Sequence, residues 1–152
     1  MRHETFMRLA LEEAQRAADL DEVPIGAVAV LDGEVIAADH NRRETDQDPT
    51  GHAELLVIRK AAQRLGRWRL SGVTLYVTIE PCLMCAGALV LARVDRVVFG
   101  ASDPKAGALV SLYDIQNDVR LNHRFEVLSG ILEPECRSVI QGYFRKKRDS
   151  NQ

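Results

Sequence analysis

The chain has 152 residues, a net charge of −2 at pH 7, 46% hydrophobic residues and 28% charged residues. This composition is typical of a folded globular domain and excludes an intrinsically disordered chain. No apolar run approaches the roughly 20 residues of a membrane span, and the N-terminal residues lack the apolar core of a signal peptide. We therefore expect one domain over residues 1–152, cytoplasmic and without a membrane partner.

The first half of the chain predicts a helix, a hairpin and a second helix. Apolar residues recur at helical spacing from Phe6, so an amphipathic helix should end near Asp21. Two extended segments follow, and Asp32-Gly33 between them predicts a hairpin with a type I′ turn. The strands should cover residues 23–31 and 35–38. A polar loop over 40–51 leads to a helix over 52–65, which Gly66 ends.

The second half alternates strands with helices. Strands are predicted over 74–78, 96–100 and 125–128, and helices over 81–92, 109–115 and 134–148. Together the two halves predict an α/β layered domain with a mixed sheet. The hairpin should be antiparallel, and the later strands should be parallel because helices connect them.

Two short segments place metal-binding side chains where helices are predicted to begin. His52 lies at the start of one helix, and Cys82 and Cys85 lie in the first turn of another. These are zinc ligands, and three of them leave the fourth tetrahedral position open for water, as a catalytic site requires. Two thiolates and a neutral imidazole also balance the charge of Zn²⁺. We expect the helix N-termini to lower the pKa of both thiols.

Glu54 stands two residues after the predicted zinc ligand His52. The three ligands do not need a fourth, so we interpret Glu54 as a proton carrier between a water molecule and a substrate. Two other interpretations of the cysteines are a redox pair and a structural zinc site completed by Cys136 or His40. The conjunction of all four residues favours catalytic zinc, and Cys136 then becomes a buried structural thiol.

Two stretches carry basic residues without any acidic one, despite the negative net charge. They span residues 59–69 and 137–148, and the second includes Arg145, Lys146, Lys147 and Arg148. Either stretch is compatible with a solvated helix face or with contacts to a polyanion.

The segments His52-Ala53-Glu54 and Pro81-Cys82-Leu83-Met84-Cys85 resemble the signature of the zinc-dependent cytidine and nucleotide deaminase superfamily. Further segments between residues 5 and 148, including 22–27, 98–101 and 103–107, resemble the bacterial tRNA adenosine deaminases within it. The resemblance implies a three-layer α/β/α cytidine-deaminase-like fold with a five-stranded mixed sheet. It also implies one Zn²⁺ per subunit and a homodimer. His40 and Gly51 depart from the family pattern, which usually has alanine at the second position.

The resemblance implies a hydrolase that converts the wobble adenosine of a tRNA anticodon stem-loop to inosine, usually in arginine tRNA. Zinc-activated water would attack C6, Glu54 would relay protons, and ammonia would leave. By the same resemblance, Asn41 and Asp103 would bind the substrate. Lys105, Arg145, Lys146, Lys147 and Arg148 would contact RNA phosphates.

Two alternatives stay open at this point. A free-base or nucleoside deaminase of guanine or cytosine type would share the zinc motifs. The predicted helix over 109–115 and the basic last helix favour a polynucleotide substrate instead. A non-catalytic, zinc-stabilised RNA-binding module is the other alternative, but it would have no use for Glu54.

Overall fold

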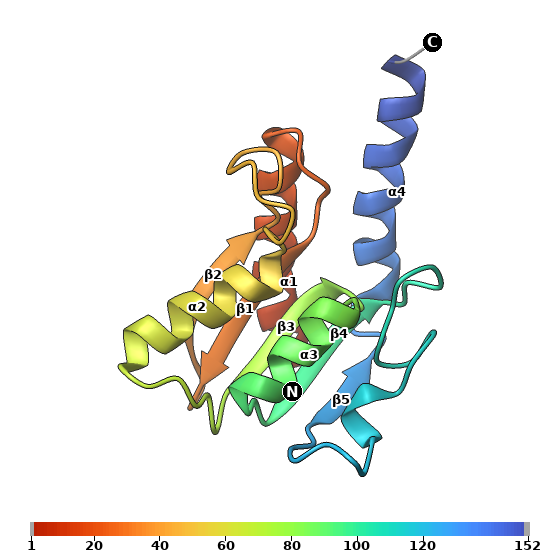
Figure 1. The fold of residues 1–152 in the computed structure, drawn as a ribbon. Helices are drawn as coiled ribbons and strands as arrows, with labels where there is room; N and C mark the ends of the chain where they lie inside the picture. The colour runs from red at the N-terminus through yellow and green to blue at the C-terminus, as the bar shows by residue number, and fades with distance from the viewer. Residues whose placement is uncertain (1, 151–152) are drawn as a thin grey trace.

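A five-stranded mixed sheet forms the middle layer of the computed structural model, which describes residues 2–150 (Figure 1). The strand order is β2-β1-β3-β4-β5. The strands are β1 (Gly26–Leu31), β2 (Glu34–His40), β3 (Thr74–Ile79), β4 (Arg96–Ala101) and β5 (Glu126–Ser129). The helices are α1 (His3–Asp19), α2 (Ala53–Leu65), α3 (Leu83–Ala92) and α4 (Glu133–Ser150), with one 3₁₀ turn, η1 (Ile115–Asn117).

The pairing of the strands confirms the predicted mixed sheet. β1 pairs antiparallel with both β2 and β3, while β3, β4 and β5 are parallel. The hairpin turn has positive φ at both central residues, 51° at Asp32 and 80° at Gly33, as a type I′ turn requires. Gly66 ends α2 in the left-handed conformation, also as predicted.

Two buried clusters, one on each face of the sheet, make the fold three-layered. Alternating side chains of β1 divide between them, with Ala27 and Ala29 on one face and Val28 and Val30 on the other. The first cluster includes Val57 of α2 and Leu89 of α3, whereas the second is built with residues of α1 and α4. In Figure 1, α4 continues well past the edge of the sheet. This is the predicted α/β/α architecture.

The predicted helix over 109–115 is wrong. Residues 102–114 form turns and loops instead, and the only helical geometry between β4 and β5 is the short η1. The backbone N–H groups of Leu109, Val110 and Ser111 all donate to the carboxylate of Glu80, at 3.1, 2.8 and 2.9 Å. These tertiary hydrogen bonds fix the segment as a loop, since one distant carboxylate gathers three successive donors.

Among residues 2–150, no helix has both the length and the apolar content that crossing a bilayer requires.

Candidate active site

The metal-binding residues predicted from the sequence lie together where α2 and α3 begin. His52 is the residue before α2 and Cys82 the residue before α3, and both have extended backbone conformations. Neither side chain caps its own helix, so both remain free to point toward each other. Cys85 joins them from the first turn of α3. The parallel strands β3 and β4, connected by α3, hold this helix against the sheet.

The distances within this group fit a tetrahedral zinc ion. His52 Nδ1 lies 3.6 Å from Cys82 Sγ and 3.5 Å from Cys85 Sγ, and the three ligand atoms lie within 4.8 Å of one another. Zinc bond lengths of about 2.3 Å to sulfur and 2.0 Å to nitrogen, at the tetrahedral angle, give a nitrogen–sulfur separation of about 3.5 Å. The donor set therefore suits zinc in both chemistry and size.

No fourth cysteine or histidine completes this group among residues 2–150. Cys136 is buried on the opposite face of the sheet, in the cluster with α1, and burial raises its pKa to about 12. His40 lies near Glu13 and Asp39 in a separate group. The two residues considered as a fourth ligand of a structural zinc site are thus both absent from it.

The two thiols have opposite pKa shifts, so the expectation of two lowered values is wrong for Cys85. A hydrogen bond from Cys85, assisted by His52 and opposed by burial, lowers the pKa of Cys82 to about 3. The hydrogen bond to Cys82, then burial and the nearby Glu54 carboxylate, raise the pKa of Cys85. The same hydrogen bond to Cys82 raises the pKa of His52.

Glu54 lies in the first turn of α2 and is 4% exposed. Its burial raises the pKa of the carboxyl to about 7, with a further contribution from the Cys82 thiolate. A carboxyl group with this pKa gains and loses a proton near neutral pH, which suits general acid–base chemistry. The site therefore combines a three-ligand cluster with a neighbouring proton carrier.

Asn41 lies beside the same helix start, directly after β2, and is 3% exposed. Its Oδ1 accepts the backbone N–H of Ala53 at 2.9 Å, and its own backbone N–H donates to the Ile25 carbonyl at 3.1 Å. These bonds fix the Asn41 amide beside Ala53, the residue between His52 and Glu54 in the sequence. Its Nδ2 group donates to no acceptor within residues 2–150, so this donor is available to a ligand.

Comparisons with known proteins agree with this geometry. The MafB19-like deaminase family matches residues 1–148. The tRNA-specific adenosine deaminase of Bacillus subtilis is 54% identical over 145 residues, covering 95% of this chain and 90% of the relative. The chain belongs to the tRNA-specific adenosine deaminase family.

Two solved structures are similar to this chain. One comes from work on A-to-I editing by tRNA:A34 deaminases at the wobble position of transfer RNA. It is 50% identical with a TM-score of 0.86, covering 89% of this chain and 98% of the other. A guanine deaminase of Bacillus subtilis is 42% identical with a TM-score of 0.64, covering 67% and 66% of the two chains.

A further buried carboxylate, that of Glu80, holds the loop beside the candidate site, a role that the sequence did not predict. This residue, 3% exposed, accepts five hydrogen bonds, from the N–H groups of Asp103, Leu109, Val110 and Ser111 and from the Ser111 hydroxyl. A Cβ at Gly107 would overlap the Glu80 carboxylate, so only glycine fits there. The only signal for this role in the sequence is the position of Glu80 just before Pro81 and Cys82.

The predicted substrate residue Asp103 lies in this same loop. Its Oδ1 accepts the backbone N–H groups of Lys105 and Ala106, at 3.0 and 3.3 Å, and its carbonyl accepts the N–H of Gly107. Gly107 also pairs with Cys82 in an isolated β-bridge. The loop is therefore attached directly to the segment that carries Cys82 and Cys85, and Lys105 is exposed on it.

The basic residues at the end of α4 of the deaminase are not equivalent. Arg145, Lys146 and Arg148 are exposed. Lys147 instead donates to the carboxylate of Asp21 at 2.8 Å, which holds α4 against the segment after α1. Of the four RNA contacts predicted on α4, three are exposed cations and one has a structural partner.

Proposed function

We propose that the protein is a zinc-dependent hydrolase that converts the wobble adenosine of a tRNA anticodon to inosine. The expected substrate is an arginine tRNA. The observation that carries the proposal is the buried Glu54 carboxyl, with a pKa near 7, beside three ligand atoms at zinc-compatible distances. Because tRNA is a cytoplasmic substrate, the proposal places the enzyme in the cytoplasm.

His52, Cys82 and Cys85 would hold the metal, one ion per subunit. When bound, zinc supplies Lewis acidity that brings the pKa of a water molecule near neutral. Ligation also requires Cys85 to lose its proton, so zinc uptake should release protons. The protein's own side chains would transfer the protons and orient the base.

Glu54 performs the proton transfers. Its carboxylate accepts a proton from the attacking water and delivers it to N1 of the adenine while a C–O bond forms at C6. It then transfers the second water proton to the amino group, and the C6–N bond breaks to release ammonia. The oxygen of inosine thus comes from water, and Glu54 ends in the state in which it began.

Asn41 would orient the base. Its Oδ1 is already bonded to Ala53 N–H, so Nδ2 is the group that can donate to a purine acceptor. A base bound in this way lies next to the first turn of α2, where Glu54 is placed. Base flipping into such a pocket is the general solution for enzymes that modify a nucleobase.

RNA contacts would come from two exposed regions. Arg145, Lys146 and Arg148 on α4 can meet phosphates, and Lys105 with Asp103 can meet nucleotides beside the target. The loop that carries Asp103 is held by Glu80 and bridged to Cys82, which keeps it near the reaction site.

A homodimer is the expected assembly. One face of α3 carries Leu83, Met84 and Leu91, which are 50%, 37% and 70% exposed. Helical spacing places these three side chains on the same side of α3. Such an apolar face beside an active site is typical of a surface covered by another chain, and we propose a second copy of this chain.

A free-base deaminase of guanine type is less well supported. The guanine deaminase structure of Bacillus subtilis is 42% identical to this chain, compared with 50% for the tRNA deaminase structure. The predicted helix over 109–115 was one of the two arguments against a free-base substrate. That segment is a loop, so this argument is withdrawn. The family membership and the exposed cations of α4 therefore favour a tRNA substrate over a free base.

Ammonia release from a panel of substrates tests the proposal. The purified zinc-loaded protein is offered an anticodon stem-loop with adenosine at the wobble position, and separately free guanine, adenosine and cytidine. We expect ammonia from the stem-loop alone and none with the Glu54→Ala variant. Turnover of free guanine without turnover of the stem-loop would replace this proposal by the guanine deaminase alternative.

A further inference from the structure

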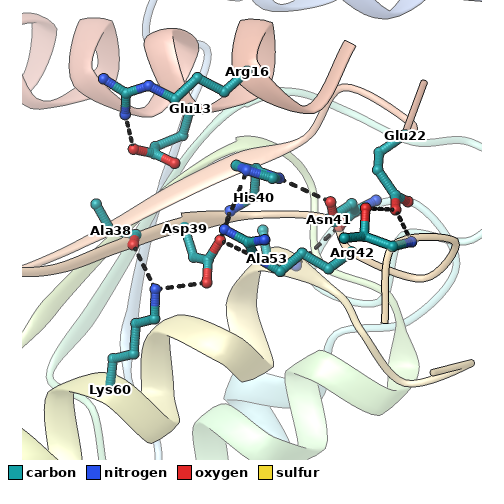
Figure 2. A network of polar contacts seen from close by, with 11 residues as sticks. Glu13, Arg16, Glu22, Ala38, Asp39, His40, Asn41, Arg42, Ala53 and Lys60 are labelled. Carbon is teal, nitrogen blue, oxygen red and sulfur yellow. Dashed lines mark hydrogen bonds and ion pairs between the residues drawn. The ribbon is translucent and has the colours of Figure 1, made fainter. Parts of the chain in front are cut away.

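The two residues on either side of Asn41, His40 and Arg42, both donate hydrogen bonds to one buried carboxylate, that of Asp39. Asp39, whose side chain is 3% exposed, accepts the backbone N–H of His40 at 2.7 Å and the Nε–H of Arg42 at 2.8 Å, both on Oδ1 (Figure 2). His40 in turn donates from Nδ1 to the carbonyl of Asn41 at 2.9 Å. The backbone on both sides of Asn41 is therefore fixed with respect to Asp39.

The other oxygen of Asp39 connects this strand end to α2. Lys60 Nζ lies 2.8 Å from Asp39 Oδ2, and Figure 2 shows its side chain extending from α2 toward the end of β2. Lys60 is less than two turns after Glu54 on the same helix. Asp39 and Asn41 thus bind α2 at two separate places, one through Lys60 and one through Ala53 N–H.

Asp39, Glu13 and His40 have ligand atoms close enough together to suggest a second metal site. Cations already occupy the carboxylates, however. Arg16 pairs with Glu13, while Arg42 and Lys60 pair with Asp39. Burial opposes ionisation of Asp39, but the hydrogen bonds from Lys60, His40 and Arg42 hold its pKa below the ordinary value. The carboxylates of this group are therefore paired with side-chain cations and do not form a metal site. The function of the group follows from the residues that it holds in place.

We infer that Asp39 and Lys60 are positioning residues for the reaction: through their ion pair they set the distance between Asn41 and α2, and so the orientation of the bound base. This rests on the proposed function, in which Asn41 contacts the purine. The physical basis is that a nucleobase must be held to within a fraction of an ångström of its attacking group, and a displacement of about 1 Å costs about 100-fold in rate. β1 already holds the end of β2, but a strand end joined to α2 through the Ala53–Asn41 hydrogen bond alone has more freedom relative to α2 than one also joined through Asp39 and Lys60.

Matched single variants test this inference on the zinc-loaded enzyme with the wobble-adenosine stem-loop. Lys60→Gln removes the ion pair from an exposed position, and Arg59→Gln removes the same charge from the adjacent position of α2, which has no ion-pair partner within residues 2–150. We expect Lys60→Gln to lower kcat/KM by about 10-fold and Asp39→Asn by about 10- to 100-fold, while Arg59→Gln changes it less than about twofold. Zinc content should stay at one per chain in all three.

A double-mutant cycle distinguishes positioning of Asn41 from a general loss of structure. If Asp39 acts through Asn41, then adding Asp39→Asn to Asn41→Ala should lower kcat/KM by less than about twofold further, because the amide to be positioned is gone. A full further loss in that background would overturn the inference, as would equal effects of Lys60→Gln and Arg59→Gln. A wild-type enzyme that fails to deaminate the stem-loop would instead overturn the proposed function, so the two failures are distinguishable.

Discussion

Replacing Glu80 with alanine should destabilise the protein by about 4 kcal/mol. Its carboxylate accepts hydrogen bonds from four backbone N–H groups, of Asp103, Leu109, Val110 and Ser111. The Leu109 donor is fully buried, and leaving it unsatisfied costs about 1–3 kcal/mol. The other donors are partly buried and regain water, so each loses about 0.5–1 kcal/mol.

Thermal unfolding followed by circular dichroism measures this loss. For a domain of this size, 4 kcal/mol corresponds to a Tm lowered by about 8–16 °C. The control is Glu126→Ala, whose side chain is 74% exposed and pairs with Arg96 at 3.0 Å, and which should cost less than about 1 kcal/mol. If Glu80→Ala unfolds within the range of this control, the carboxylate does not hold the loop and the reasoning is refuted.

The pH dependence of the stability difference between wild type and Glu80→Ala tests whether the negative charge of Glu80 stabilises the fold. Burial raises the pKa of Glu80, but the hydrogen bonds from Ser111 and the other donors outweigh it and lower the pKa below the ordinary 4.5. A lowered carboxyl pKa stabilises the fold fully above the unfolded value, and this stabilisation is lost as the pH falls through the folded value. The difference in stability between wild type and Glu80→Ala should therefore be complete at neutral pH and shrink below pH 4.5. A difference that stays constant into stronger acid would show that ionisation of Glu80 contributes nothing.

Three further predictions concern the chemistry. Glu54→Ala should retain zinc and stem-loop binding but lose inosine formation by at least about 1000-fold, because the proton carrier is gone; single-turnover assays would detect any retained activity. Cys82→Ser should lose most of its zinc by elemental analysis, and full occupancy would contradict the ligand set. Neutralising residues 145–148 should reduce the slope of log affinity against log salt by about 2, since three exposed cations are removed; an unchanged slope would mean that these residues face solvent only.

The elements predicted correctly from the sequence are those with local causes. Asp32-Gly33 fixes a hairpin because both residues adopt positive φ, and Gly66 ends α2 for the same reason. The grouping of His52, Cys82 and Cys85 was also predictable, because His52 and Cys82 both stand at helix starts, which a layered α/β domain brings to one edge of its sheet. Local spacing and helix geometry suffice for these features.

The features that were not predictable depend on partners far apart in the chain. The segment after Gly107 has apolar residues at helical spacing, yet Glu80 gathers its backbone donors into a loop. The opposite pKa shifts of Cys82 and Cys85 arise because the two thiols hydrogen-bond each other, which spacing alone does not reveal. The ion pair between Asp39 and Lys60 likewise joins two elements, and in the sequence Lys60 was one cation in a basic stretch.

The most direct test of the central claim is to incubate the zinc-loaded protein with the wobble-adenosine stem-loop in water enriched in oxygen-18, and to identify the modified nucleotide by mass spectrometry. The account predicts inosine at the wobble position only, with the heavy oxygen at C6, since Glu54 activates water against a base held in RNA. An unchanged wobble adenosine, under conditions where the same preparation deaminates free guanine, would contradict it.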